Sequence, residues 1–177
     1  MISLMQAQAA AQFASLIVFG TLARWYAVPW LRSRERAGAL IPLLWIHVFR
    51  YVALQAFSAQ RDGFPISDGG LRDIVVGDLL GTVLALAAIF ALRHRLRVGL
   101  LLAWLLVAET VYDTVANIRG GVQEHLLGQA GGVTWLILSY YVPLVVVSVV
   151  LIAWQLYSRR GEGFTVAQRS IPAARMS

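Results

Sequence analysis

The chain has 177 residues, of which 59% are hydrophobic and 14% are charged, and its formal net charge is +6. So little charge is rare in a soluble domain of this length and indicates a polytopic membrane protein. It has neither cysteine nor lysine, which excludes Cys-ligated clusters and covalently bound retinal or pyridoxal phosphate. The positive charge comes from arginines placed between apolar runs, so it predicts a membrane topology and no nucleic-acid partner.

The apolar runs predict an all-α bundle of five transmembrane helices. The predicted helices cover residues 6–27, 38–60, 71–92, 98–118 and 132–157, with a kink expected at Pro143. Gly-rich polar stretches separate the third helix from the second and the fifth from the fourth. Residues 1–158 are therefore predicted to form a single five-helix transmembrane domain. Residues 159–177 are predicted to form a polar, mobile, cytoplasmic tail.

Arginine positions predict the orientation of the chain. The first and third connections and the tail are rich in arginine: Arg32, Arg34, Arg36, Arg93, Arg95, Arg97, Arg159, Arg160, Arg169 and Arg175. The second and fourth connections hold few arginines, interspersed with acids. The positive-inside rule then places the N-terminus outside and the C-terminus in the cytoplasm. The expected location is the inner membrane of a bacterium, with the lipid bilayer as the surroundings.

Polar residues interrupt the apolar pattern of the second, third and fourth helices. The candidate ligand- or ion-binding residues are His47, Arg50, Asp78, Glu109 and Asp113. Glu109 and Asp113 are four residues apart and share a helix face. Counted from the outer helix ends, Asp113 lies ~7 Å deep, Asp78 ~10 Å, and Glu109 and Arg50 ~15 Å. These similar depths predict one polar cluster inside the bundle.

The charges of this cluster do not balance. One arginine against three acids leaves a formal excess of two negative charges, which a protonated His47 would only halve. We expect Arg50 to pair with Glu109 or Asp78. The remaining charge predicts a proton held on an acid, with Glu109 the deepest candidate, or a bound cation, or an opening to water. The alternative is structural, since ion pairs also lock helices together and acids near a helix end reach headgroup water.

The polar stripes also predict a cavity that opens outward between the second, third and fourth helices. Its candidate lining residues are Tyr51, Gln55, Asn117, Tyr140 and Tyr141. A divalent metal is a possible cofactor, because imidazole and carboxylates together suit Zn, Mn or Fe. The candidate metal ligands are His47, Asp78, Glu109 and Asp113.

Gly77 and Gly81 form a pair of small residues one helical turn apart on the third helix. Such a face permits close helix approach and predicts a packing role, with a second copy of the chain or another membrane protein as a possible partner.

Three classes of function remain open. The first is a protein whose cavity binds or moves a proton, a cation or a small lipophilic ligand. The second is an intramembrane enzyme that uses the acid cluster, with or without a metal, on an apolar substrate. The third is an accessory subunit of a larger membrane complex. No hydrolase, phosphate-loop or dinucleotide-binding motif is present.

Two resemblances accompany this pattern. The acids of ETVYD resemble, in general idea alone, those of emopamil-binding and sterol-isomerase-like proteins, whose other motifs are absent and whose helix count differs. The segments WIHVFRYVALQAFSAQ, GVTWLILSYYVP and WQLYSRRGE resemble a small inner-membrane family of bacteria with Arg-rich proteomes. That family has no assigned function, so this resemblance implies a membrane location and no activity.

Overall fold

The structure is a computed structural model in which residues 2–162 are described. The described residues form five long helical runs and no strand, which confirms the predicted all-α fold. Most of the predicted tail lies outside the described residues. The runs are α1 (Leu4–Leu22), η1 (Ala23–Ala27) and α2 (Val28–Arg32); α3 (Arg36–Val48), η2 (Phe49–Gln55) and α4 (Ala56–Arg61); α5 (Asp68–Arg93); α6 (Val98–Gln123); and α7 (Gly132–Leu136), η3 (Ile137–Tyr141) and α8 (Val142–Ser158).

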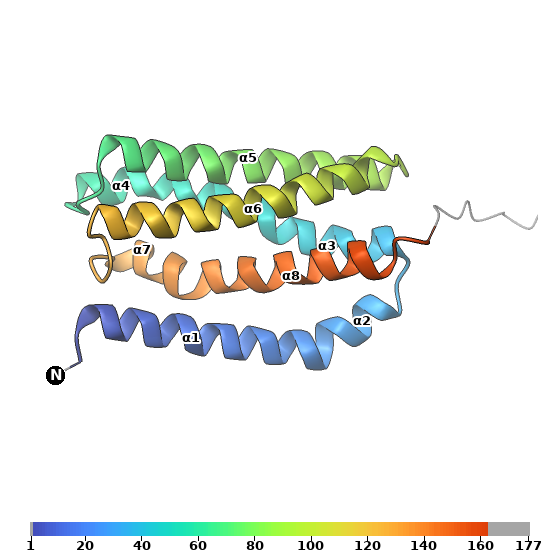
Figure 1. Ribbon diagram of the computed structural model, residues 1–177, viewed down its shortest axis with the longest axis horizontal. Helices are drawn as coiled ribbons and strands as arrows, with labels where there is room; N and C mark the ends of the chain where they lie inside the picture. Colours follow the sequence, from blue (N-terminus) through green and yellow to red (C-terminus); the bar gives the residue numbers. More distant parts are fainter. Residues whose placement is uncertain (1, 163–177) are drawn as a thin grey trace, which may run out of the picture.

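Successive runs alternate in direction, so the N-terminus and the end of α8 lie at opposite ends of the bundle (Figure 1). Among the described residues, four runs are long and apolar enough to cross a membrane: those over Arg36–Arg61, Asp68–Arg93, Val98–Gln123 and Gly132–Ser158. The first run is more polar, because it carries three glutamines and Arg24. A fifth span and the orientation of the termini stay predictions.

The four apolar runs form the core of the bundle, and the first run packs on one side of it. α5 contacts α3 and α6, while α8 contacts α3 and α6. α1 packs against α8 and the π-helical η3, and Figure 1 shows it along the edge of the bundle next to α8.

Pro143 explains one contact of the first run. In η3 the Val142 amide donates to the Ile137 carbonyl, five residues back. With the same five-residue spacing, the amide of residue 143 would donate to the carbonyl of Leu138, but proline has no amide hydrogen. The carbonyl of Leu138 instead accepts from Gln12 Nε2 on α1, at 3.1 Å. Where a kink was expected, the structure has the π-helical segment η3 just before Pro143, and η3 also anchors α1.

Two hydrophobic clusters hold the bundle together. The larger lies near the end where α2, α3 and α8 meet and includes Leu40, Leu44, Ala88, Leu106 and Ile152. The smaller joins Ala56 of α4, Ile66, and Leu71 and Val75 of α5. The buried residues Arg50, Thr82, Thr110 and Asp113 fall between these two clusters along their helices. The apolar clusters offer these side chains no hydrogen-bond partner, so they bond to one another and to neighbouring polar groups.

Candidate functional site

Arg50 is the centre of the polar cluster, and its side chain is only 2% exposed. Its Nε donates to Asp78 Oδ1 at 2.7 Å. Its Nη1 donates to Glu109 Oε2 at 2.6 Å and to Thr110 Oγ1 at 3.0 Å. Its Nη2 donates to Asp113 Oδ2 at 2.7 Å and to Glu109 Oε1 at 3.2 Å. A guanidinium has five N–H groups, so every donor of Arg50 has a partner.

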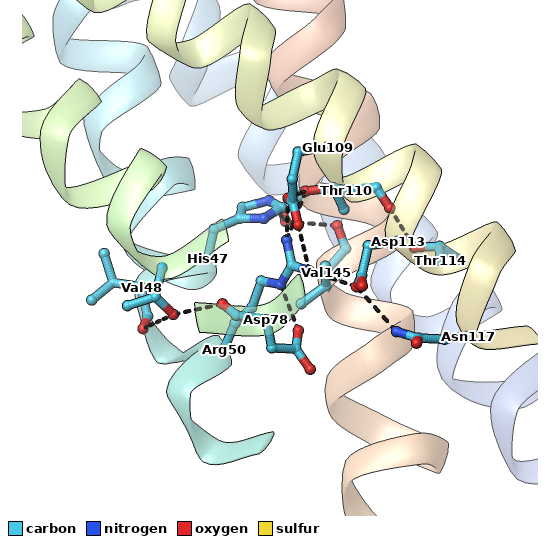
Figure 2. Close-up of polar contacts among 12 residues, drawn as sticks. His47, Val48, Arg50, Asp78, Glu109, Thr110, Asp113, Thr114, Asn117 and Val145 are labelled. Atoms are coloured by element: carbon cyan, nitrogen blue, oxygen red, sulfur yellow. Dashed lines mark hydrogen bonds and ion pairs between the residues drawn. The ribbon is translucent and has the colours of Figure 1, made fainter. Parts of the chain in front are cut away.

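Three helical runs supply these groups, and Figure 2 shows the three carboxylates converging on the guanidinium. Arg50 comes from η2, Asp78 from α5, and Glu109 and Asp113 from α6. The carboxylate side chains are 22%, 10% and 12% exposed, in that order. Arg50 therefore contacts both acids expected for it and also Asp113. The cluster ties η2, α5 and α6 into one unit.

The backbone around Arg50 is irregular. η2 is a 3-10 helix of 7 residues inside an otherwise α-helical run. Such segments rarely exceed three or four residues, and a long one inside a helix often marks a functional hinge or strain. On the facing helix, Thr82 Oγ1 lies 3.3 Å from the Val48 carbonyl just before η2.

Gly77 and Gly81 bring α5 directly against the cluster. A Cβ at Gly81 would lie 2.6 Å from Arg50 Cζ, and one at Gly77 would lie 2.9 Å from Asp113 Cγ. No side chain larger than hydrogen fits at either position without displacing a charged group. The close approach expected of this pair is made within the chain; a second copy or another protein at this face stays a prediction.

Glu109 and Asp113 are held differently. Glu109 accepts hydrogen bonds from both Nη1 and Nη2 of Arg50, and Thr110 Oγ1 lies 3.2 Å from its Oε2. Asp113 accepts hydrogen bonds from Arg50 Nη2 and from Asn117 Nδ2, both at its Oδ2. Its Oδ1 faces Gly77. Bidentate, charge-assisted contacts are the strongest of this kind, so Glu109 is the main counter-charge of Arg50.

His47 lies beside the cluster but bonds elsewhere. Its side chain is fully buried, and Nε2 lies 3.0 Å from Ser148 Oγ on α8. The Ser148 hydroxyl donates to the Val145 carbonyl at 2.9 Å. We therefore assign Nε2 as the donor to Ser148, which makes Nδ1 an acceptor. Among the described residues Nδ1 has no partner, so His47 adds no positive charge to the cluster.

The five candidate lining residues separate into two places. Asn117 bonds to Asp113 at the cluster, with a distance of 3.1 Å. Tyr51, Gln55, Tyr140 and Tyr141 line a groove of about 1040 Å³ between the η2 run and the η3 run, together with Trp45 and other apolar side chains. The residues that line this groove do not include Arg50 or its three acids. The groove and the cluster are therefore separate features on different faces of η2.

The candidate metal ligands contact other groups of the protein. In the part of the chain that the structure describes, no three His, Asp or Glu side chains are grouped as ligands for one metal ion. Asp78, Glu109 and Asp113 surround a guanidinium, and His47 faces Ser148.

Comparison with known proteins places the chain in a family. A family model described as a domain of unknown function (DUF8737) matches residues 7–157. The chain belongs to this family. The match takes in all five helical runs and every residue of the Arg50 cluster, and it confirms the expected resemblance to a family without an assigned function. No curated protein and no solved structure matches the chain.

Sequence reasoning missed two members of the site. Thr110 joins Arg50 to Glu109, and Ser148 holds His47. Thr110 has a signal in the sequence, because it lies three residues before Asp113 on the same helical stripe. Ser148 has none, since an isolated serine in an apolar helix more often bonds to its own backbone.

Proposed function

We propose that this membrane-embedded helical protein holds an exchangeable proton in the Arg50 cluster, and that Asp113 carries it. The observation that supports the proposal is the contact of one guanidinium with three carboxylates at 2.6–2.7 Å. If all three acids were ionised, the cluster would keep two uncompensated negative charges. One acid at a helix centre costs roughly 2.5–3.5 kcal/mol in a membrane, so an acid that takes up a proton removes much of that cost.

The hydrogen bonds favour Asp113 as the proton carrier over Glu109. Glu109 accepts from both terminal nitrogens of Arg50, so it is the main counter-charge of the guanidinium. Asp78 is the most exposed of the three acids, so water can stabilise its charge. Asp113 is more buried than Asp78 and uses only Oδ2, which leaves Oδ1 beside Gly77 free to carry hydrogen.

A short polar route supports exchange with solvent. Asn117 bonds to Asp113 and lies one turn nearer the C-terminal end of α6, the end that lies beside α4 in Figure 1. Asp78 is on the neighbouring helix and is partly exposed. The opposite direction is closed by the larger hydrophobic cluster, which includes Leu44, Ala85 and Leu106. A proton would therefore enter and leave from the α4 end.

The decisive experiment combines difference infrared spectroscopy with unfolding of the detergent-solubilised protein at neutral pH. We expect the parent to show the carbonyl band of a protonated carboxylic acid, and Asp113→Asn to lose that band. Because asparagine resembles the protonated acid, Asp113→Asn should change the free energy of unfolding by less than about 1 kcal/mol. Glu109→Gln should keep the band and cost about 1.5–3 kcal/mol, because it removes charge-assisted hydrogen bonds.

The matched control is Asp73→Asn, which neutralises an exposed acid on α5. It should leave both the band and the stability unchanged. A spectrum without a protonated carboxyl band, or a band that survives Asp113→Asn, would show that the proposed proton carrier is wrong. Equal costs for Asp113→Asn and Glu109→Gln would favour a purely structural ion cluster.

A further inference from the structure

The groove between η2 and η3 is a second feature of the molecule, independent of the Arg50 cluster. One wall is the end of α3 with the 3-10 segment η2, and the other is α7 with the π-helical η3 and the start of α8. Tyr141 fastens the two walls, since its hydroxyl donates to the Ile46 carbonyl at 2.7 Å. Irregular helical segments of both kinds occur often at functional sites. Here one of each kind faces the same space.

The size of the groove fits a lipid chain. Its volume of about 1040 Å³ is just above the roughly 300–1,000 Å³ typical of small-molecule sites. From Trp45 to Gln55 its wall extends roughly 18 Å at the rises of α and 3-10 helices. One leaflet contributes roughly 15 Å, half of the ~30 Å hydrocarbon core. The groove is therefore about as long as one acyl chain.

The lining of the groove is apolar and open. Trp45, Phe49, Leu54, Val133 and Leu136 line it, and each of these side chains is about half exposed. In a membrane these surfaces face hydrocarbon, so a chain can enter sideways from the lipid.

A polar mouth adjoins the groove at the α4 end. A second pocket of about 390 Å³ shares Gln55 and Val133 with the groove. Ser58, Asp62, Gln129 and Thr134 are among the described residues that line it, and no arginine is. Gln55 and Thr134 bond to each other at 3.2 Å, where the two pockets meet. These amides and hydroxyls suit a head group that carries hydroxyls.

The charge of the mouth disfavours a phosphate head group. Asp62 would repel an anion, and no basic side chain of the lining compensates it. The other end of the bundle differs, because exposed Arg32 and Arg34 lie over the rings of Trp154 and Trp30 there. The basic side chains that attract anionic lipids are therefore at that end.

We propose that the groove binds one acyl chain of an uncharged membrane lipid whose hydroxylated head group lies in the mouth at Gln55 and Thr134. The hydrocarbon chain runs along η2 toward Trp45. The site takes a lipid of glycerol-head type in preference to an anionic one, because Asp62 rather than an arginine borders the head.

The test uses the full chain in mild detergent with a monoacylglycerol that carries bromine on its acyl chain. Bromine quenches nearby tryptophan fluorescence, and Trp45 lines the groove. We expect saturable quenching in the parent and loss of the saturable component in Trp45→Phe. A lysophosphatidic acid with the same chain should bind at least roughly tenfold more weakly. Gln55→Leu should weaken monoacylglycerol binding up to about tenfold, as for one lost hydrogen bond.

Two valine substitutions separate the groove from ordinary lipid contact. Val133→Phe fills the groove where it meets the mouth, and Val115→Phe enlarges an equally exposed side chain on α6, outside the groove. Only Val133→Phe should abolish saturable quenching.

Quenching that is unsaturable or equal in both variants would overturn the site. Equal or tighter binding of the anionic lipid would overturn the head-group assignment. A dimer in the parent that Val133→Phe dissociates would show that a second copy occupies the groove. None of these results depends on the proton proposal.

Discussion

At the scale of single residues, Gly81 shows how little room the Arg50 cluster leaves. The guanidinium makes five hydrogen bonds to four residues of two helices, so it cannot move away from an added methyl group at 2.6 Å. Gly81→Ala should therefore lower the free energy of unfolding by about 1–3 kcal/mol, as overpacking does elsewhere. The measurement is equilibrium unfolding in mixed micelles with increasing denaturing detergent.

Gly120→Ala is the matched control for this prediction. Gly120 lies in α6, and nothing comes within 4 Å of the methyl group that the substitution would add. The change should stabilise the protein by about 0.5–1 kcal/mol, because alanine loses less conformational entropy than glycine in a helix. If both alanine variants behave alike, the contact between α5 and Arg50 is not tight.

At the scale of helices, Glu124 links the end of α6 to the start of α5. Its carboxylate accepts from the Ser67 amide at 2.8 Å and from the Ser67 hydroxyl at 2.7 Å. Ser67 Oγ in turn accepts from the Gly70 amide as the N-cap of α5. The amide bond first, and then the hydroxyl bond, lower the pKa of Glu124 below its ordinary value.

A lowered folded pKa gives a defined pH dependence. The ionised form of Glu124 stabilises the fold above the unfolded pKa of about 4.3, and this contribution is lost as the pH falls through the lower folded value. Glu124→Gln should therefore flatten the decline of the melting temperature below about pH 4.3. Melting curves in detergent from neutral to acid pH measure this. Glu35→Gln is the control, since Glu35 makes no capping hydrogen bond; an identical acid decline in the parent and in Glu124→Gln would contradict the prediction.

At the scale of the whole molecule, the alternating runs and the arginine-rich connections predict the topology. A reporter fused after residue 177 should be cytoplasmic, and a tag in the loop at residues 62–67 should be accessible from outside. A tag before α1 decides the fifth span, because α1 is more polar than the other runs. We expect outside accessibility there too. Reversed labelling at the loop and the C-terminus would mean that the proposed proton route opens to the other side.

The sequence by itself determined the class of protein and its helices. Hydrophobic length and helical periodicity are local properties, so the all-α fold could be predicted from composition and spacing alone. The convergence of Arg50, Asp78, Glu109 and Asp113 followed from their similar depths. Residues three or four apart on one helix share a face, regardless of how that helix packs against the others.

Only the tertiary structure decided which atoms meet. Depth along a helix does not define its rotation about its own axis, and η2 turns about 20° further per residue than an α-helix does. That extra rotation redirects the side chains after Val48. With this rotation Arg50 contacts Asp78 and Glu109, while Tyr51 lines the groove. The contact of Gly81 with Arg50 and the groove between η2 and η3 likewise depend on distant segments, because each needs two helices placed side by side.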